Sequence, residues 1–422
     1  MKLAWHMPTL RRTCCGLSQR ALRLANGLRQ FGHDVEFYVE AGKSDIAGDV
    51  LDGFCVRRIS TQRNRLLHWS LQALGRRRAA AALAAQITSD HEVMLTCQPE
   101  FASEYVRHRR DTPLIFVCGG TTLLHDEADR ARSAVVSWPR RGFFALDRHL
   151  KRRNERNAFR LADAVVFDSD ATRAHVTRDY RLDIARFQTI HGGVDSDEFQ
   201  PPSTQQRHNA RHRLGIGPSE DVLAWTGRLS PEKNIDFLLN ALAYCRRRPH
   251  RVLIVGDGPA RDALMKLNHR LGLNSVVSFV GIQSDVRPFL HAADVFVFPS
   301  RGESFGGALV EAMACGLPCI ALRPNGDAIR NASLEIIEPE TSGLLVDRAE
   351  PAALAAAIEL LLVNRELRNA LGAAARRRAT SLFTWAAAAA QFNALVNEIA
   401  ARGRPNRRLD AASLTALQPA HA

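Results

Sequence analysis

The sequence predicts an α/β protein with two doubly wound domains that face a central cleft. Short apolar runs alternate with amphipathic helical stretches along almost the whole chain, which is the pattern of βαβ units on a parallel sheet. A polar, proline-bearing stretch at residues 201–206 and a turn-rich stretch at residues 215–218 divide the alternation into two series. The length of 422 residues suits two or three domains with cores of their own.

The first series predicts the elements of an N-terminal domain. Apolar residues recur at helical spacing over residues 21–31, and Gly32 follows where a helix end favours a residue that tolerates positive φ. Later apolar runs in this half are expected as buried strands at residues 33–39, 114–118, 164–167 and 187–190.

The second series predicts a second sheet with a ligand edge. Its strands are expected at residues 222–225, 252–255, 276–280, 295–298 and 318–322, with helices between them. Each strand ends in a Gly, Pro or Ser cluster, and open α/β sheets bind their ligands at that end. The carboxyl edge of this sheet is therefore the expected position of a ligand site.

These patterns also predict the boundaries of the domains. The N-terminal domain covers residues 1–198, a linker covers residues 199–217, and the C-terminal domain covers residues 218–382. A last helix is expected at residues 383–401. Residues 402–422 are rich in Arg, Pro and Ala without a clear period, so we expect a frayed, disordered tail there.

Composition excludes several classes of protein. With 46% hydrophobic and 24% charged residues, the chain is not disordered, collagen-like or a coiled coil. The start offers no apolar segment suited to a signal peptide, and no uncharged stretch reaches the ~20 apolar residues of a membrane-spanning helix. The eight cysteines include no Cys-x-x-Cys pair, which argues against a disulfide framework or a zinc knuckle. We therefore expect a reducing, cytoplasmic compartment.

A first charged cluster follows the first expected strand of the second series. Gly227 opens the run Gly-Arg-Leu-Ser-Pro-Glu-Lys-Asn, in which Ser230 suits a helix N-cap and Pro231 the first helical position. Arg228 and Lys233 are then held on a short strand-to-helix turn, beside the positive end of a helix. Guanidinium, ammonium and free N–H groups together form a diphosphate site. The alternative is a pair of solvated surface cations.

A second cluster follows the fourth expected strand of the same series. Glu303 lies in the turn after that strand, and Glu311 is expected on the helix that follows. Residues 304–307 would present backbone N–H groups at the helix start, where Gly306 and Gly307 let a ligand approach closely. Two carboxylates beside a phosphate site suit a ligand with hydroxyls, such as a sugar or a ribose. Helix capping and solvation are the alternative roles.

The two clusters resemble the motifs of the retaining glycosyltransferases of family 4. The shared features are the Gly-Arg-Leu…Glu-Lys-Asn turn and the two glutamates separated by seven residues. The resemblance extends to residues 161–169, 191–195, 255–259, 279–281 and 383–385. It is strong from about residue 150 to residue 400 and weaker before that.

This resemblance implies a GT-B fold, in which two Rossmann-like domains face a central cleft. Residues 1–198 would then bind the acceptor, and residues 218–382 would bind a nucleotide sugar. The helix at residues 383–401 would return to the N-terminal domain. The donor would be a substrate, with UDP- and GDP-sugars favoured, and no cofactor or metal is implied.

The resemblance also assigns roles to residues. Arg228 and Lys233 would neutralise the departing diphosphate, Glu303 would contact the donor sugar, and Glu311 would bind the ribose hydroxyls. Gly281 and Ile282 would frame the base. The other implied donor-binding residues offer mainly backbone contacts to sugar or phosphate: Gly16, Gly227, Ser304, Phe305, Gly306 and Gly307. Retention without an obvious nucleophile implies front-face attack, with a departing phosphate oxygen taking the acceptor proton. Glu303 as a covalent nucleophile is the less favoured variant.

The sequence departs from the family pattern in the N-terminal half. The first loop keeps only one glycine of the usual pair, Gly16. The expected strand at residues 114–118 is followed by Gly119 and Gly120, where many members have a histidine. Gly119 and Gly120 would contact the sugar or the acceptor. The nearest histidine is His125, which is expected either to make such a contact or to be a helix-cap or surface residue.

The charge excess leaves the partner open. The net charge of +13 fits nucleic acid, an anionic membrane or a phosphorylated substrate. Basic clusters lie in the N-terminal half, at residues 76–78, 107–110, 140–141 and 151–153. Since family 4 enzymes often touch membranes, we expect peripheral contact with the inner face of a cytoplasmic membrane. The expected acceptor is a glycan or a lipid-linked glycan. The alternative is that the basic clusters reflect only an arginine-rich composition.

The favoured function is a hexosyl transfer in the synthesis of cell-envelope polysaccharide, lipopolysaccharide or glycolipid, without a nucleic acid partner. Two rivals remain: a nucleotide-sugar epimerase on a similar fold, and a non-catalytic binder of membrane or nucleic acid. An oxidoreductase is poorly supported, because Gly256 and Gly258 lack the third glycine of a dinucleotide fingerprint.

Overall fold

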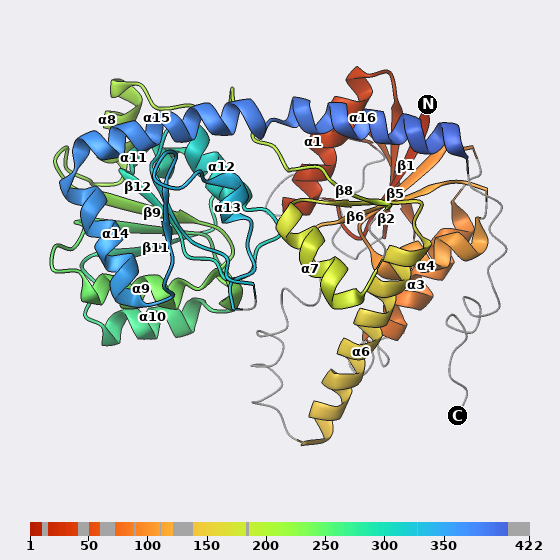
Figure 1. Cartoon of the computed structure of the whole chain (residues 1–422), viewed down its shortest axis with the longest axis horizontal. Helices are drawn as coiled ribbons and strands as arrows, with labels where there is room; N and C mark the ends of the chain where they lie inside the picture. Colours follow the sequence, from red (N-terminus) through yellow and green to blue (C-terminus); the bar gives the residue numbers. More distant parts are fainter. Residues whose placement is uncertain are drawn as a thin grey trace.

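The computed structural model describes residues 1–10, 16–40, 50–59, 72–87, 90–109, 111–120, 138–182, 185–326 and 328–403. Within these residues the chain forms two largely parallel sheets, each with helices packed on its faces (Figure 1). The predicted fold class, α/β with two doubly wound halves, is confirmed.

The N-terminal half contains the sheet with strand order β3-β4-β2-β1-β5-β6-β7-β8, which is parallel apart from the β3–β4 pair. Its strands are β1 (Lys2–Met7), β2 (Asp34–Glu40), β3 (Val50–Leu51), β4 (Phe54–Ile59), β5 (Val93–Thr96), β6 (Leu114–Cys118), β7 (Ala164–Phe167) and β8 (Phe187–Thr189). Its helices are α1 (Gly16–Gln30), α3 (Gln72–Gln86), α4 (Pro99–His108), α6 (Trp138–Leu161) and α7 (Asp170–Tyr180).

The C-terminal half contains the parallel sheet with strand order β11-β10-β9-β12-β13-β14. Its strands are β9 (Val222–Thr226), β10 (Arg251–Val255), β11 (Val277–Gly281), β12 (Val295–Phe298), β13 (Cys319–Leu322) and β14 (Leu344–Val346). Its helices are α8 (Thr204–Arg213), the 3-10 turn η2 (Pro231–Lys233), α9 (Ile235–Tyr244), α10 (Arg261–Arg270), α11 (Arg287–Ala292), α12 (Gly307–Ala314), α13 (Ser333–Ile336), α14 (Pro351–Val363) and α15 (Arg365–Leu382).

Each sheet has an apolar core on both faces, because successive side chains of a strand point to opposite sides. In β9, Val222 and Ala224 belong to one core, and Leu223 and Trp225 belong to the other. Such strands read as continuous apolar runs, as expected for a parallel sheet covered on both faces. This is why the strands of the second series were predictable from sequence.

The last helix, α16 (Trp385–Arg402), runs back from the C-terminal half and packs on α1 (Figure 1). Its residues Phe392 and Val396 belong to a core of the N-terminal sheet. Gly27 of α1 lies directly beneath Ala389, and a Cβ added at Gly27 would come 2.2 Å from the Ala389 Cβ. Close packing of these two helices therefore requires the glycine.

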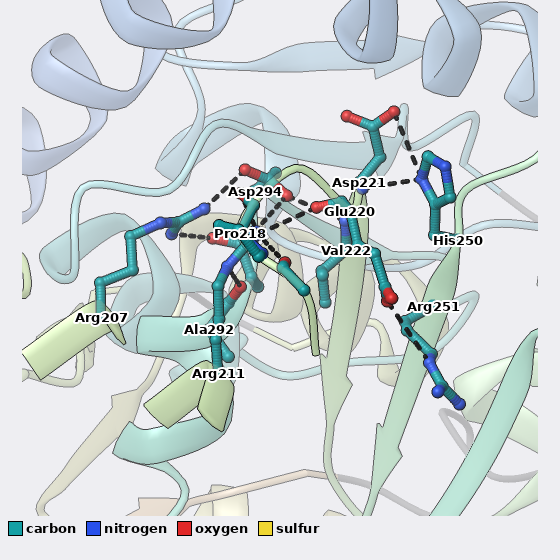
Figure 2. A network of polar contacts seen from close by, with 12 residues as sticks. Arg207, Arg211, Pro218, Glu220, Asp221, Val222, His250, Arg251, Ala292 and Asp294 are labelled. Carbon is teal, nitrogen blue, oxygen red and sulfur yellow. Dashed lines mark hydrogen bonds and ion pairs between the residues drawn. The ribbon is translucent and has the colours of Figure 1, made fainter. Parts of the chain in front are cut away.

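The segment predicted as a linker, residues 199–217, holds α8, whose arginines brace the amino ends of the C-terminal strands (Figure 2). Arg207 and Arg211 pair with Asp294 at 2.7 and 2.8 Å. The same carboxylate accepts the Val222 N–H at 2.9 Å. This network fixes the edge of the sheet opposite to the one at which the ligand site is expected.

Two further findings concern the ends of the chain and the membrane. Of the predicted tail at residues 402–422, residues 404–422 lie outside the described part. Among the helices that are described, none combines the length and the apolar character needed to cross a membrane.

Candidate functional site

The predicted clusters lie at the carboxyl ends of β9 and β12, two neighbouring strands in the middle of the C-terminal sheet. The chain adds β10 and β11 on one side of β9 and then returns to place β12 on the other side. Strand order therefore reverses between β9 and β12, and open α/β sheets bind ligands outside the carboxyl ends at such a switch point. The first cluster directly follows β9, and the second directly follows β12.

The loops after these two strands are joined by hydrogen bonds. The Glu232 carbonyl accepts the Arg301 N–H at 2.9 Å. Asn234 Nδ2 donates to the Pro299 carbonyl at 3.0 Å, and this bond is buried. The two clusters are therefore held in a fixed arrangement relative to each other.

The start of the helix after β9 differs from the prediction. Ser230 and Pro231 begin the 3-10 turn η2 rather than the α-helix, and the Ser230 hydroxyl bonds the Glu232 carboxylate instead of a backbone N–H. Asn234 takes a left-handed φ of 58°, and α9 begins at Ile235. Asparagine tolerates this conformation, so Asn234 was the overlooked signal that the turn continues.

Lys233 and Glu303 form an ion pair across the two loops, and their side chains are only 19% and 18% exposed. The family resemblance assigned them to different parts of the donor, the diphosphate and the sugar. In the structure they neutralise each other. A diphosphate that engaged Lys233 would release the Glu303 carboxylate for another partner.

Arg228 is exposed, and its guanidinium has no hydrogen bond or ion pair with any residue that the structure describes. It stands beside Gly227, whose φ of 151° favours glycine. The turn after β10 packs tightly against this loop, because a Cβ at Gly256 would lie 1.8 Å from the Gly227 carbonyl oxygen. Gly256 is thus explained by close backbone approach, and Arg228 is a cation held ready on a rigid turn.

Glu311 is a half-buried carboxyl on α12. Burial raises its pKa to about 7, and the negative charge of Glu198 acts in the same direction. Within the described residues its carboxyl has neither a hydrogen-bond donor nor a cation. Hydroxyl groups of a ligand would supply donors to this carboxyl.

The loop before α12 uses its two glycines differently. Gly306 has a φ of 116°, and a Cβ there would lie 3.2 Å from the Phe298 ring. Gly307 begins α12 and is exposed, with open space where a Cβ would stand. Gly306 is therefore required by the backbone, whereas Gly307 leaves space for a ligand at the first turn, whose N–H groups have no partner within the helix.

Gly281 and Ile282, which were expected to frame the base, lie at the end of β11. Gly281 has a φ of 82°, and its carbonyl accepts the Gly256 N–H at 2.8 Å. The Ile282 side chain is 62% exposed and offers an apolar surface after β11, two strands away from β9. The role of both residues toward a base remains a prediction.

In the N-terminal half, Gly16 is the first residue of α1, with open space around it. Gly119 follows β6 and approaches the first turn of α1, since a Cβ there would lie 2.5 Å from Leu17 Cδ2. Gly120 has a φ of 139°. His125 lies outside the described residues.

Sequence reasoning missed residues of the N-terminal half that contact the loop at residues 303–307, which is expected to bind the donor and is called the donor loop. The hydroxyls of Ser169 and Thr172, at the start of α7, both donate to the Ser304 carbonyl. Ser169 could have been noticed as a serine just after a buried strand, where N-caps occur. The contact with Ser304, more than 130 residues away, has no local sequence signal.

One group of potential metal ligands occurs in the described part of the chain: Asp170, His191 and Glu335, with ligand atoms within 4.8 Å of one another. These atoms already have partners. Glu335 accepts the Asp170 N–H at 2.8 Å and lies 3.0 Å from His191 Nε2. The group is a junction between the two halves, and the expectation of metal independence stays a prediction.

Comparison with known proteins identifies the family models and the relatives that the chain resembles. The family model described as Glycosyl transferases group 1 matches residues 206–378, and the one described as Glycosyltransferase Family 4 matches residues 15–198. D-inositol 3-phosphate glycosyltransferase from Mycobacterium marinum is 34% identical over 233 residues, or 53% of this chain and 47% of that relative.

A GDP-mannose-dependent alpha-(1-6)-phosphatidylinositol monomannoside mannosyltransferase from Mycobacterium tuberculosis is also 34% identical, over 54% of this chain and 60% of the relative. The chain spans about half the length of the curated relatives it matches.

Solved structures share the fold over most of the chain. Sucrose-phosphate synthase from Thermosynechococcus elongatus superimposes with a TM-score of 0.75 at 23% identity, covering 95% of this chain and 99% of that one. Anabaena HepE in complex with UDP and glucose gives a TM-score of 0.70 at 21% identity, covering 94% and 100%. With a family match in each half and this shared two-domain architecture, the chain belongs to the group 1, family 4 glycosyltransferases of GT-B fold.

Proposed function

We propose that the protein transfers a hexose from a nucleotide-sugar donor to a glycan or lipid-linked acceptor, with retention of anomeric configuration and without a metal. The observation that carries the proposal is the charge arrangement at the switch point. Arg228 and the Glu311 carboxyl have no polar partner among the described residues, and Lys233 supplies an ammonium group nearby. The two cations stand on the turn after β9 and Glu311 stands on α12, at the end of the sheet where this fold binds ligands. These groups match a diphosphate and a ribose.

The chemistry follows from charge development on the leaving group. As the glycosidic bond breaks, negative charge grows on the diphosphate, and Arg228 and Lys233 stabilise it without the reorganisation that water would need. Lys233 then exchanges its partner from Glu303 to the diphosphate. The acceptor hydroxyl oxygen bonds to the anomeric carbon on the same face that the diphosphate leaves, and an oxygen of the departing phosphate takes the hydroxyl proton.

Glu303 is better suited to contact the donor sugar than to attack it. Its carboxylate is paired with Lys233, and pairing with a cation weakens a nucleophile. Front-face transfer is therefore favoured over a covalent intermediate on Glu303.

The relatives support a donor class and a cellular context for the proposal. One of them is named as GDP-mannose-dependent and acts on a phosphatidylinositol mannoside, and a structural neighbour is a complex with UDP and glucose. We accordingly favour a GDP- or UDP-hexose as donor. The acceptor is a glycan or glycolipid of the cell envelope, reached from the cytoplasmic side.

The test is release of nucleoside diphosphate from a panel of UDP-, GDP-, ADP- and dTDP-sugars, in EDTA, with and without a membrane-lipid extract as acceptor source. We expect release from one donor that increases with the extract and persists in EDTA, with the product anomer retained by NMR. An epimerase would interconvert the free nucleotide sugar without releasing diphosphate. No reaction or binding with any donor would leave a non-catalytic binder.

Membrane contact is supported by the way basic helices gather. Helices α3, α4 and α6, which carry residues of all four basic clusters, pack on one another. The pKa of Arg107 is lowered mainly by burial, which outweighs the opposing effect of its partner Glu104. The positive charges of Arg77 and Arg153, which lie on the two other helices, lower it further. Such a surface suits anionic lipid at about 1 kcal/mol per basic residue. Failure to co-sediment with phosphatidylglycerol vesicles at low salt would contradict this part of the proposal.

A further inference from the structure

The N-terminal end of α7 is tied to the donor loop of the other half. Ser169 Oγ and Thr172 Oγ1 both donate to the Ser304 carbonyl, the second at 3.1 Å. Both side chains are buried, with residue exposures of 0% and 2%. A backbone carbonyl of the C-terminal half is thus satisfied by two hydroxyls of the N-terminal half.

Further contacts hold α7 against the same region. The Glu335 carboxylate, on α13 of the C-terminal half, accepts the N–H groups of Asp170 and Ala171 at 2.8 and 2.6 Å. A carboxylate at a helix N-terminus is favoured by the helix dipole. Toward the other end of α7, Asp179 pairs with Arg330 at 3.0 Å, and the Arg330 carbonyl accepts the Glu303 N–H at 3.0 Å.

Holding the Ser304 carbonyl fixes the direction of the next N–H group. A trans peptide is planar, so its C=O and N–H point in opposite directions. When the Ser304 carbonyl points at α7, the Phe305 N–H must point away from α7. That N–H has no acceptor among the described residues, and it belongs to the loop expected to contact the donor.

The Phe305 side chain is fixed separately, by the segment that connects the halves. It is 6% exposed, and its ring lies against Gly192, where a Cβ would come 2.9 Å from Phe305 Cδ1. The rings of His191 and Phe383 stand 5.9 and 5.6 Å from it, centroid to centroid. With the side chain packed away, the backbone N–H is the polar group of Phe305 that a ligand could use.

We propose that Ser169 and Thr172 are positioning residues, which aim the Phe305 N–H at the donor when α7 is docked on the C-terminal half. The proposal rests on the proposed function for the identity of the ligand. It makes the donor loop depend on the other domain, since undocking α7 frees the Ser304 peptide to rotate. Docking of the halves and binding of a nucleotide sugar would then favour each other.

Thr172→Val is the cleanest test, because it removes one hydroxyl and keeps the shape of the side chain. Ser169 also accepts the Thr172 N–H as the N-cap of α7, so changing it would weaken the helix as well. Thr177→Val is the matched control: it is the same substitution on the same helix, and the Thr177 hydroxyl bonds only the Arg173 carbonyl within α7.

Two measurements are compared across wild type, Thr172→Val and Thr177→Val. The first is hydrogen exchange of the backbone at residues 303–307 without ligand. The second is the affinity for the nucleotide sugar found in the donor panel. We expect faster exchange and about three- to tenfold weaker binding in Thr172→Val alone, with recovery in Thr172→Ser.

The outcomes separate this inference from the proposed function. Unchanged exchange at residues 303–307 in Thr172→Val would overturn the inference, as would equal effects of Thr177→Val. If the wild type binds no nucleotide sugar, the proposed function fails, and the exchange comparison still decides whether α7 holds the loop. A loss of thermal stability without a change in exchange or affinity would mean a purely structural contact and would also overturn the inference.

Discussion

Replacing Glu311 with glutamine is expected to stabilise the ligand-free protein in a pH-dependent way. Burial, with a contribution from the charge of Glu198, raises the pKa of the Glu311 carboxyl from 4.5 to about 7. Between these values the folded protein binds more protons than the unfolded chain, so this carboxyl makes stability fall as the pH rises. Above pH ~7 the full cost of ionising it in the folded protein is about 3 kcal/mol.

Glutamine keeps the shape of the side chain but carries no charge. Glu311→Gln should therefore raise the free energy of unfolding by up to about 3 kcal/mol at pH ~8 and leave it almost unchanged at pH ~4.5. The assay is urea unfolding at a series of pH values, followed by the fluorescence of the buried Trp225 and the other tryptophans. The control is Glu366→Gln, at an exposed carboxyl on α15 without a partner in the described part of the chain.

Two results would refute this reasoning. Either no gain at high pH, or a gain of the same size at both ends of the pH series, would show that the carboxyl is not desolvated. The variant should also bind nucleotide sugar more weakly, because a neutral amide is a poorer acceptor for ribose hydroxyls than a carboxylate. A more stable protein that binds less well is the pattern expected of a residue kept for function rather than for folding.

Other predictions concern the ion pair and the close-packed glycines. Glu303→Gln should reduce sugar transfer but keep or improve the affinity for the nucleoside diphosphate, because it releases Lys233. Lys233→Gln should weaken that affinity. If calorimetry shows that both variants lose affinity for the diphosphate equally, the pairing is contradicted. Gly27→Ala should destabilise the protein by about 1–3 kcal/mol in urea unfolding despite its better helix propensity, since its Cβ would overlap Ala389. Gly256→Ala should abolish diphosphate binding by displacing the loop at Gly227, whereas normal binding would contradict that contact.

The sequence predicted five of the six strands of the C-terminal sheet and the position of both clusters; the short edge strand β14 was missed. Each cluster is contiguous in sequence and follows an apolar strand, and the carboxyl ends of neighbouring parallel strands must meet. The pairing of Lys233 with Glu303 was not predicted, because an edge of a sheet can be inferred from sequence but the direction of a side chain cannot. The 3-10 turn was missed because serine and proline suit the start of either kind of helix.

The N-terminal half was harder to predict. Strand β1 was missed because Lys2 and His6 interrupt its apolar run. In the structure His6 is fully buried and stacked on Phe101, and burial lowers its pKa to about 3, so it is neutral and behaves as a core residue. The contacts of α7 with the Ser304 carbonyl depend on how the two halves dock, which no local pattern contains.

The most direct test of the central claim is a calorimetric titration of UDP- and GDP-sugars into wild type, Arg228→Ala and Arg270→Ala, all in EDTA. Arg270 is a matched control: it is exposed, has no partner among the described residues, and ends α10, which runs from the site toward the opposite edge of the sheet. We predict that one nucleotide sugar binds wild type and Arg270→Ala equally and Arg228→Ala at least about tenfold more weakly. Equal binding by all three proteins would contradict a diphosphate site at the switch point between β9 and β12.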